Sequence, residues 1–377
     1  MRLRSVAGAA LVLAVLGFAA FYVLTVPSTL PQDALTPRAA DLANGETMFN
    51  IGGCASCHAT PKQDNRLRLG GGRVLRSPFG TFRVPNISSD PKAGIGAWTE
   101  LQFANAVLKG VGRNNEHLYP SFPYTSYQRM RLDDIRDLYA FLKTVPPDTT
   151  PSEPHQLPFP FNIRWLLGGW KLLFFDGKPL APDPARDDAY NRGAYLLEGP
   201  GHCAECHSAR NTLGAIKPSK RFAGGADLEG DGWVPNITPH ADGLAEWSAK
   251  DIEYFLETGL TPDGYAVTSG MADVVKNTAK LSAADRTAIA VYLKALPPRE
   301  GKRPPRKSTS LHQDVGGHAG PVVVRADQPK MASQAGNEID ILLLVRLYRN
   351  AGPGRTDHAR IPEIDGLEEV GRREIVN

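Results

Sequence analysis

The first feature of the hydropathy pattern is one unbroken apolar run near the start of the chain. Residues 5–25 carry no charge, follow Arg2 and Arg4, and end just before Pro27. At about 1.5 Å per helical residue, the run is long enough to cross a hydrocarbon core about 30 Å thick. We therefore predict a transmembrane signal anchor over residues 1–26, with its positive end in the cytoplasm and the remainder exported. A cleaved signal peptide is the alternative, although its apolar region is usually only about 7–15 residues long.

Beyond this run, apolar residues recur with the period of amphipathic helices. They line one face of residues 133–144 and again of residues 282–295. Asp133 and Ser282 are candidate N-caps for these two helices. The intervening stretches, such as residues 70–80, are rich in Gly and Pro and show too little alternation for a sheet. The pattern therefore predicts a mainly α-helical fold with long loops.

The pattern also repeats itself along the chain. Two Cys-x-x-Cys-His motifs begin at Cys54 and Cys203, an offset of 149 residues, and Val-Pro-Asn-Ile recurs at residues 84–87 and 234–237. Self-similarity at a fixed offset indicates a duplicated unit. We call residues 41–147 the first repeat and residues 187–298 the second repeat, and we predict that each is a domain. We therefore predict an anchor at 1–26, a first domain at 41–147 and a connector at 148–186. A second domain follows at 187–298, and a largely irregular tail at 299–377.

Composition and charge narrow the range of partners. Of the 377 residues, 42% are hydrophobic and 22% are charged, as in ordinary globular proteins. The net charge of +3 is too close to zero for a nucleic-acid-binding protein, so we expect no nucleic acid partner. Basic residues outnumber acidic ones in the first repeat, and the reverse holds in the second. Opposite charges suggest that the two repeats dock different partners, because complementary fields steer encounters.

The cysteine motifs carry the chemistry. Cys-x-x-Cys-His is the spacing of c-type haem attachment: thiols one helical turn apart reach two vinyl groups, and the histidine binds the iron. A zinc site needs four ligands, a thioredoxin-like redox pair needs a βαβ unit, and a disulfide would leave both histidines unexplained. We therefore predict two covalently attached haem c groups. The attachment residues and the proximal iron ligands are Cys54, Cys57 and His58 for the first haem and Cys203, Cys206 and His207 for the second.

The sixth iron ligand differs between the repeats. Met271 is the candidate in the second repeat, and His/Met ligation closes the iron to substrates and raises its potential, which suits electron transfer. The same offset places Phe122 opposite Met271 in the first repeat. Met130 lies eight residues further on and aligns with Leu281, ahead of the final helix. Three options follow for the first haem: Met130, which we favour, His117, or an open position.

These residues together resemble the class I c-type cytochromes, specifically the cytochrome c subunits of periplasmic membrane-bound dehydrogenases of the alcohol and gluconate type and of some molybdenum hydroxylases. The resemblance covers both cysteine motifs, residues 78–87, 94–96 and 117–120, and the region around Met271. It implies two tandem class I cytochrome c domains, each with a methionine ligand and with an early helix crossing the final one. The crossing residues would be Gly45, Phe49 and Phe141 in the first repeat, and Gly193, Leu197 and Tyr292 in the second.

Two departures limit what the resemblance transfers. Members of the family often hold three haems, whereas residues 299–377 contain no cysteine and so offer no third attachment site. Phe122 stands where many relatives have the methionine ligand, so the ligation and potential of the first haem cannot be inherited.

The sequence therefore predicts an electron carrier rather than an enzyme. It would relay single electrons on the periplasmic side of the bacterial inner membrane, as the electron-transfer subunit of a dehydrogenase complex. Its partners would be a periplasmic dehydrogenase or other donor, and a respiratory-chain or soluble cytochrome acceptor. The alternative is a dihaem enzyme, peroxidase-like or thiosulfate-oxidising, with a catalytic first haem. Because haem attachment uses every cysteine, a Cys-ligated catalytic haem is excluded, which weakens the thiosulfate version.

Overall fold

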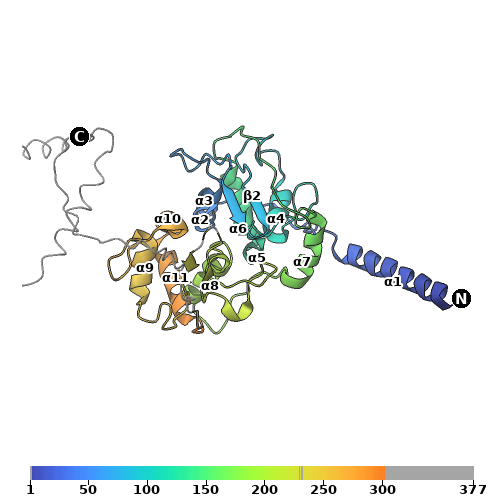
Figure 1. Cartoon of the computed structure of the whole chain (residues 1–377). Helices are drawn as coiled ribbons and strands as arrows, with labels where there is room; N and C mark the ends of the chain where they lie inside the picture. Colours follow the sequence, from blue (N-terminus) through green and yellow to red (C-terminus); the bar gives the residue numbers. More distant parts are fainter. Residues whose placement is uncertain (1, 229, 231, 302–377) are drawn as a thin grey trace, which may run out of the picture. The chain divides into compact units, whose positions relative to one another are not determined.

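The computed structural model describes residues 2–228, 230 and 232–301, and within them the fold is mainly helical (Figure 1). All but the first three residues of the predicted tail lie outside this description. The longer helices are α1 (Arg2–Leu24), α2 (Leu42–Ile51), α4 (Glu100–Lys109), α6 (Leu132–Leu142), α7 (Leu167–Phe174), α8 (Asp188–Glu198), α9 (Ala249–Thr258), α10 (Ser269–Thr278) and α11 (Ala283–Ala295). Short helical turns are α3 (Cys54–His58), α5 (Tyr124–Tyr127), η1 (Arg164–Leu166), η2 (Cys203–Glu205) and η3 (Pro218–Lys220).

The predicted apolar run forms one continuous helix, α1. Its segment Val6–Leu24 has a mean hydropathy of 2.4, and none of its residues is buried. The helix is therefore long and apolar enough to cross a membrane. A signal sequence has the same properties.

Each repeat contains a pair of helices that cross at a glycine. α2 packs on α6 in the first repeat, and α8 packs on α11 in the second. A Cβ atom on Gly45 would lie 2.2 Å from the carbonyl oxygen of Asp137, and one on Gly193 would lie 1.9 Å from that of Ala288. Any larger residue would force the helices apart, because interiors this closely packed have no spare volume. The helix crossing that the family resemblance implied is thus present in both repeats.

α4 and α9 begin and end with the same local signals. Thr99 and Ser248 cap them, and in each helix the cap hydroxyl and the side chain three residues later bond reciprocally to backbone N–H groups. Both helices end at a glycine in the left-handed conformation, with φ of 58° at Gly110 and 74° at Gly259. The sequence repeat therefore encodes a repeat of local structure.

The start of α6 differs from the prediction. Arg131 occupies the N-cap position, and Asp133 lies in the first turn. A carboxylate there still favours the helix, since it faces the partial positive charge of the helix N-terminus. Ser282 caps α11 as predicted, because its Oγ accepts a hydrogen bond from the backbone N–H of Asp285 at 3.0 Å.

The Gly- and Pro-rich stretch that we predicted to be loop contains part of a hairpin. Strands β1 (Val74–Ser77) and β2 (Gly80–Arg83) pair antiparallel, and β3 (Gly225–Ala226) pairs with β4 (Trp233–Val234) in the same way. Strands this short carry too few alternations to be recognised from sequence. The turn in the first hairpin relies on Gly80, whose φ of 119° is unfavourable for other residues.

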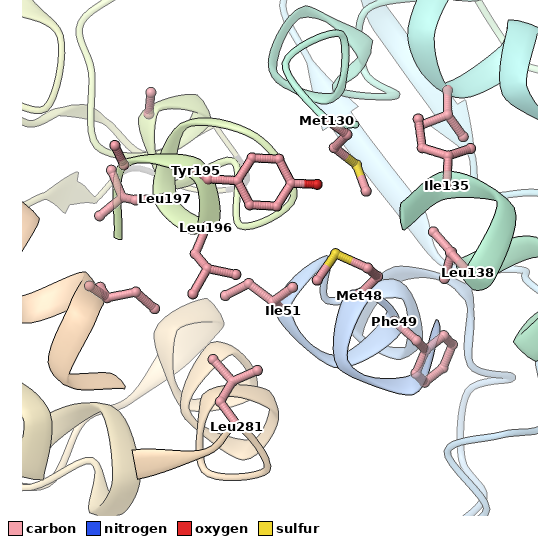
Figure 2. Packing of buried hydrophobic residues seen from close by; sticks show 14 of the residues in the cluster. Met48, Phe49, Ile51, Met130, Ile135, Leu138, Tyr195, Leu196, Leu197 and Leu281 are labelled. Carbon is pink, nitrogen blue, oxygen red and sulfur yellow. The ribbon is translucent and has the colours of Figure 1, made fainter. Parts of the chain in front are cut away.

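One hydrophobic core is shared by the two repeats. Figure 2 shows Met48 and Met130 of the first repeat beside Tyr195 of the second, and Ile51 beside Leu196. Each of these five side chains is less than a tenth exposed. The buried surface of one repeat is therefore completed by the other.

Tyr195 also makes polar contacts across this core. Its hydroxyl donates a hydrogen bond to the carboxylate of Asp134 and accepts one of 3.2 Å from the backbone N–H of Arg131. The Arg131 guanidinium lies over its ring, 4.6 Å from the centroid. Because buried hydroxyls are normally hydrogen-bonded, these contacts favour this alignment of the repeats.

The connector is packed against the first repeat through α7. The Nζ of Lys171 donates hydrogen bonds of 2.7 Å to the carbonyl oxygens of Lys109 and Gly110. These carbonyl oxygens lie at the C-terminus of α4 and have no hydrogen-bond partner within the helix. The lysine therefore supplies the hydrogen bonds that the helix itself cannot.

Asp148 ties together three loops at the end of the first repeat. Its carboxylate accepts hydrogen bonds from the side chains of Arg68 (2.6 Å) and Thr60 (3.3 Å) and from the backbone of Thr150 (2.9 Å). Its side chain is almost fully buried. Hydrogen bonds, chiefly from the side chain of Thr150, lower the pKa of Asp148 to about 2.

Replacing Asp148 with asparagine should lower stability at neutral pH by about 2 kcal/mol, since a depressed carboxyl pKa stabilises the fold above the unfolded value. This contribution is fully present above about pH 4 and is lost as the pH falls towards about 2. Chemical denaturation at several pH values would measure it, with exposed Asp33→Asn as the control. A difference between wild type and Asp148→Asn that stays constant from pH 6 to pH 3 would contradict the expectation.

Candidate functional site

The first cysteine motif forms a single helical turn, α3, directly after α2. Gly52 ends α2, and Gly53 turns the chain with a φ of 59° that glycine adopts without strain. Cys54 and Cys57 are three residues apart, so they lie on one face of the turn, and both are partly exposed. Burial among protein atoms raises the pKa of the Cys54 thiol to about 12. The two thiols are thus placed to reach one ligand that lies against this face.

His58, the last residue of the turn, is held by a backbone carbonyl. Its Nδ1 lies 2.8 Å from the carbonyl oxygen of Pro85, which can only accept, so Nδ1 carries the proton. Burial lowers the pKa of His58 to about 4, and the ring is therefore neutral. A neutral ring with Nδ1 protonated presents the lone pair of Nε2, the atom that commonly binds metals.

Asn86 keeps the Pro85 carbonyl in place. Its Nδ2 donates to the carbonyl oxygens of Asp148 (2.6 Å) and Thr150 (2.9 Å), and its Oδ1 accepts from the N–H of Ser88 at 2.8 Å. The side chain is only 4% exposed, so these bonds compete little with water. The repeated Val-Pro-Asn-Ile segment therefore acts as a support for the histidine.

The second motif has the same arrangement. His207 Nδ1 lies 2.8 Å from the carbonyl oxygen of Pro235, and Asn236 anchors the loop through a 2.7 Å bond to the carbonyl oxygen of Arg299. Burial lowers the pKa of His207 as well. The turn before the cysteines differs, because His202 replaces a glycine and adopts a φ of 39°. Both motifs thus present two thiols and one neutral imidazole, a donor set that fits covalently attached haem.

Each cysteine motif also forms hydrogen bonds with the opposite repeat. The Oγ of Ser56, between the first two cysteines, accepts a 2.8 Å hydrogen bond from Nδ2 of Asn277 in α10. Reciprocally, Glu205 of the second motif accepts hydrogen bonds from Thr125 (2.8 Å) and Ser126 (2.7 Å) in α5. The two motifs therefore lie at the contact between the repeats.

His202 and Tyr127 add contacts at the junction between the two repeats. The carbonyl oxygen of Gly52, two residues before Cys54, lies 3.2 Å from Nε2 of His202 and accepts a 3.3 Å bond from the hydroxyl of Tyr127. The His202 and Tyr127 rings meet edge to face, with centroids 5.5 Å apart. A continuous set of protein contacts thus joins the two attachment turns.

Sequence reasoning missed these residues. Ser56 and Glu205 occupy the same variable position of the two motifs, yet nothing in the sequence pairs either with α10 or α5. The one signal in the sequence was the carboxylate of Glu205. A glutamate that is buried beside a predicted haem-attachment cysteine needs a positively charged or hydrogen-bonding partner. Arg210 supplies it through a 2.6 Å ion pair.

The candidates for a sixth ligand lie in different surroundings. Met271 lies in the first turn of α10 and is partly exposed, whereas Met130 is 3% exposed within the shared core. His117 is 5% exposed, and its Nε2 lies 2.7 Å from the carbonyl oxygen of Thr25, at the end of α1. That contact leaves only Nδ1 of His117 without a hydrogen bond.

Comparison with known proteins agrees with this donor set. The cytochrome c family model matches residues 42–146. A dihaem c-type cytochrome from Cereibacter sphaeroides is 47% identical over 306 residues, which cover 79% of this chain and 99% of that protein.

Several relatives are named as subunits of dehydrogenases, and two of them illustrate the match. The cytochrome c subunit of a quinone-dependent alcohol dehydrogenase from Gluconacetobacter polyoxogenes is 37% identical, covering 70% of this chain and 58% of the subunit. The cytochrome c subunit of gluconate 2-dehydrogenase from Pantoea cypripedii is 35% identical, covering 76% of this chain and 64% of the subunit. The chain thus spans roughly three fifths of each of these subunits.

Proposed function

The chain belongs to the c-type cytochromes, in a family with a dihaem cytochrome and the cytochrome c subunits of alcohol and gluconate dehydrogenases, and we propose that it relays single electrons through two covalently attached haems. One observation carries this proposal. In both motifs the histidine Nδ1 lies 2.8 Å from the carbonyl oxygen of the proline in the Val-Pro-Asn-Ile segment. A matched pair of neutral imidazoles, each beside two thiols, supports two haems rather than one.

The residue roles follow from that geometry and from the repeat. Thioether bonds would form at four cysteines, and two histidines would bind iron through Nε2: Cys54, Cys57 and His58 in the first repeat, Cys203, Cys206 and His207 in the second. The Pro85 and Pro235 carbonyls keep each ring oriented and increase the basicity of its free nitrogen. A bound haem supplies an iron centre that gains and loses one electron. The chain supplies the attachment, the ligand orientation and the burial that tune it.

We assign Met271 as the sixth ligand of the second haem and Met130 as that of the first. His117 is a weaker candidate, because its Nε2 is already hydrogen-bonded to the Thr25 carbonyl at 2.7 Å. An open sixth position at the first haem would instead favour a dihaem enzyme, peroxidase-like or thiosulfate-oxidising. Burial of Met130 in the shared core supports the closed, electron-transferring alternative, since a packed thioether keeps solvent and substrates away.

The junction between the repeats suits transfer between two haems. Contacts such as Asn277 to Ser56 and Ser126 to Glu205 join each attachment turn to the opposite repeat. Because thioether bonds would form on these turns, the contacts with the opposite repeat would hold each attachment site in a fixed place. A fixed separation keeps the electron-transfer rate constant while the protein docks and leaves its partners.

We place the protein on the periplasmic side of the bacterial inner membrane, anchored by α1. The donor would be a periplasmic dehydrogenase and the acceptor a respiratory-chain or soluble cytochrome. The relatives named as dehydrogenase subunits and the length and hydropathy of α1 support this arrangement.

Spectra of the oxidised protein test the proposal. We expect both haems of the wild type to be low-spin, and Met271→Ala and Met130→Ala each to convert one haem to the high-spin form. A thioether raises the potential relative to a weaker ligand, so each substitution should also lower the potential of one haem.

Redox titration with spectral detection would measure both effects. The matched control is Met48→Ala, which removes another methionine from the shared core. A first haem that is high-spin in the wild type and reacts with peroxide would favour the enzyme alternative.

A further inference from the structure

The connector presents an apolar surface beside α1. It is formed by five side chains that are each more than a third exposed, which we call the α7 face: Phe161, Ile163, Leu166, Leu172 and Leu173. Leu173 alone is 70% exposed. The one charged residue of α7, Lys171, is turned inward onto the end of α4. Clustered apolar surface of this kind on an otherwise packed segment marks an interaction site.

This surface is joined to the C-terminal part of α1. The Trp165 ring packs on Phe18, Phe21 and Tyr22, with centroids 5.7, 5.0 and 6.3 Å apart. A Cβ atom on Gly168 would lie 2.5 Å from Cβ of Thr25, so α7 approaches the end of α1 very closely. Figure 1 shows α7 beside this end of α1.

The contact sets the depth of α7 relative to any membrane that contains α1. Phe18 precedes Leu24, the last residue of the apolar span, by six residues, which is about 9 Å along a helix axis. A hydrocarbon layer that covers the span therefore also reaches Trp165. Helices that lie in a membrane interface bury their apolar face to about 5–10 Å, and tryptophan is enriched there.

We propose that α7 and the residues just before it lie in the interfacial layer of the membrane that α1 crosses, so that lipid covers the α7 face. This inference rests on the proposed membrane anchor. Lipid is the expected occupant because Trp165, within the segment that bears the α7 face, packs on α1, and no residue of the apolar span Val6–Leu24 is buried.

The consequence is a fixed orientation of the first repeat. With α1 as the only contact with the membrane, the first repeat could rotate about the end of that helix. A second contact through α7 would fix its orientation. Hydrogen bonds connect the first repeat to these membrane contacts. His117 Nε2 is hydrogen-bonded to the Thr25 carbonyl at the end of α1, and Lys171 connects α7 to α4. The first repeat would thus face the membrane.

Cysteine labelling of the full, haem-loaded chain tests the inference. The protein is reconstituted in vesicles of phosphatidylcholine and phosphatidylglycerol, in which attachment to haem blocks the native thiols. We expect Leu173→Cys to react with a polar maleimide about tenfold more slowly than Tyr254→Cys, because only the hydrated thiolate reacts. Tyr254 is the matched control, as it is 52% exposed on α9, away from α1.

A second measurement needs no substitution. With a photoreactive lipid in the vesicles, wild-type protein should acquire lipid adducts in residues 159–175 and none in residues 249–258.

Four outcomes would overturn the inference. Equal labelling of the two cysteines in protein that floats with the vesicles overturns it alone, and so does a lack of lipid adducts in residues 159–175. Protein that fails to float overturns the anchor and this inference together. If Leu173→Cys is protected only after a dehydrogenase is added, the α7 face binds protein rather than lipid.

Discussion

Replacing Cys203 and Cys206 with serine is expected to halve the haem content of the chain and leave the first haem in place. In the proposed arrangement two thioether bonds would hold each haem, and serine cannot form them. His207 alone would then bind the second haem reversibly. The ratio of haem to polypeptide, measured by pyridine haemochrome absorbance and by the mass of the intact chain, reads out the change.

The complementary pair, Cys54→Ser with Cys57→Ser, should also halve the haem content, and the fourfold variant should carry none. Ser56→Ala is the matched control, because it alters the same turn and removes the acceptor of the Asn277 bond while both thiols stay. Its haem content should equal that of the wild type. A chain that keeps two covalent haems after loss of either cysteine pair would overturn the attachment sites.

Replacing Gly193 with alanine should lower the free energy of unfolding by about 3 kcal/mol or more. The new Cβ would lie 1.9 Å from the carbonyl oxygen of Ala288, a backbone atom of α11 that cannot rotate away. The helices must separate to accommodate it, and the packing of the α8–α11 pair is lost. Denaturation by guanidinium chloride, followed by far-UV circular dichroism on the haem-loaded chain, would measure the loss.

Gly270→Ala is the control for this experiment. Gly270 lies in α10, and a Cβ there would meet nothing within 4 Å. Alanine should therefore be neutral or stabilise by up to about 1 kcal/mol, because it restricts the unfolded chain and favours helix. If Gly193→Ala proved as mild as Gly270→Ala, the close crossing of α8 and α11 would be contradicted.

Much of the local structure was predictable because its signals are short. The N-terminal helix and the cap of α11 were predicted, and each depends on residues within a few positions of each other. The cap of α6 was assigned to Asp133 and lies at Arg131, since several polar residues in a row offer alternative starts. The hairpin of β1 and β2 was missed, because four-residue strands show no distinct period.

The candidate site also contains residues that the sequence identified and contacts that only the structure shows. The two cysteine motifs and their histidines were recognised from spacing alone, whereas the proline carbonyl that each histidine contacts came from the structure. The partners of Ser56 and Glu205 lie in the opposite repeat, at Asn277 and Ser126, more than 70 residues away in sequence. No periodicity records such a contact, because either repeat by itself is compatible with many partners.

The amino-acid sequence by itself therefore predicted the attachment chemistry and the helical character, because each depends on residues that are adjacent or one helical turn apart, and it showed the repeat directly. Tertiary structure alone decided that the repeats share a core around Met130 and Tyr195, and that α7 lies against α1. The physical reason is that burial and close packing depend on the joint shape of surfaces brought together from distant parts of the chain. Which apolar residue meets which is settled only when those surfaces fit.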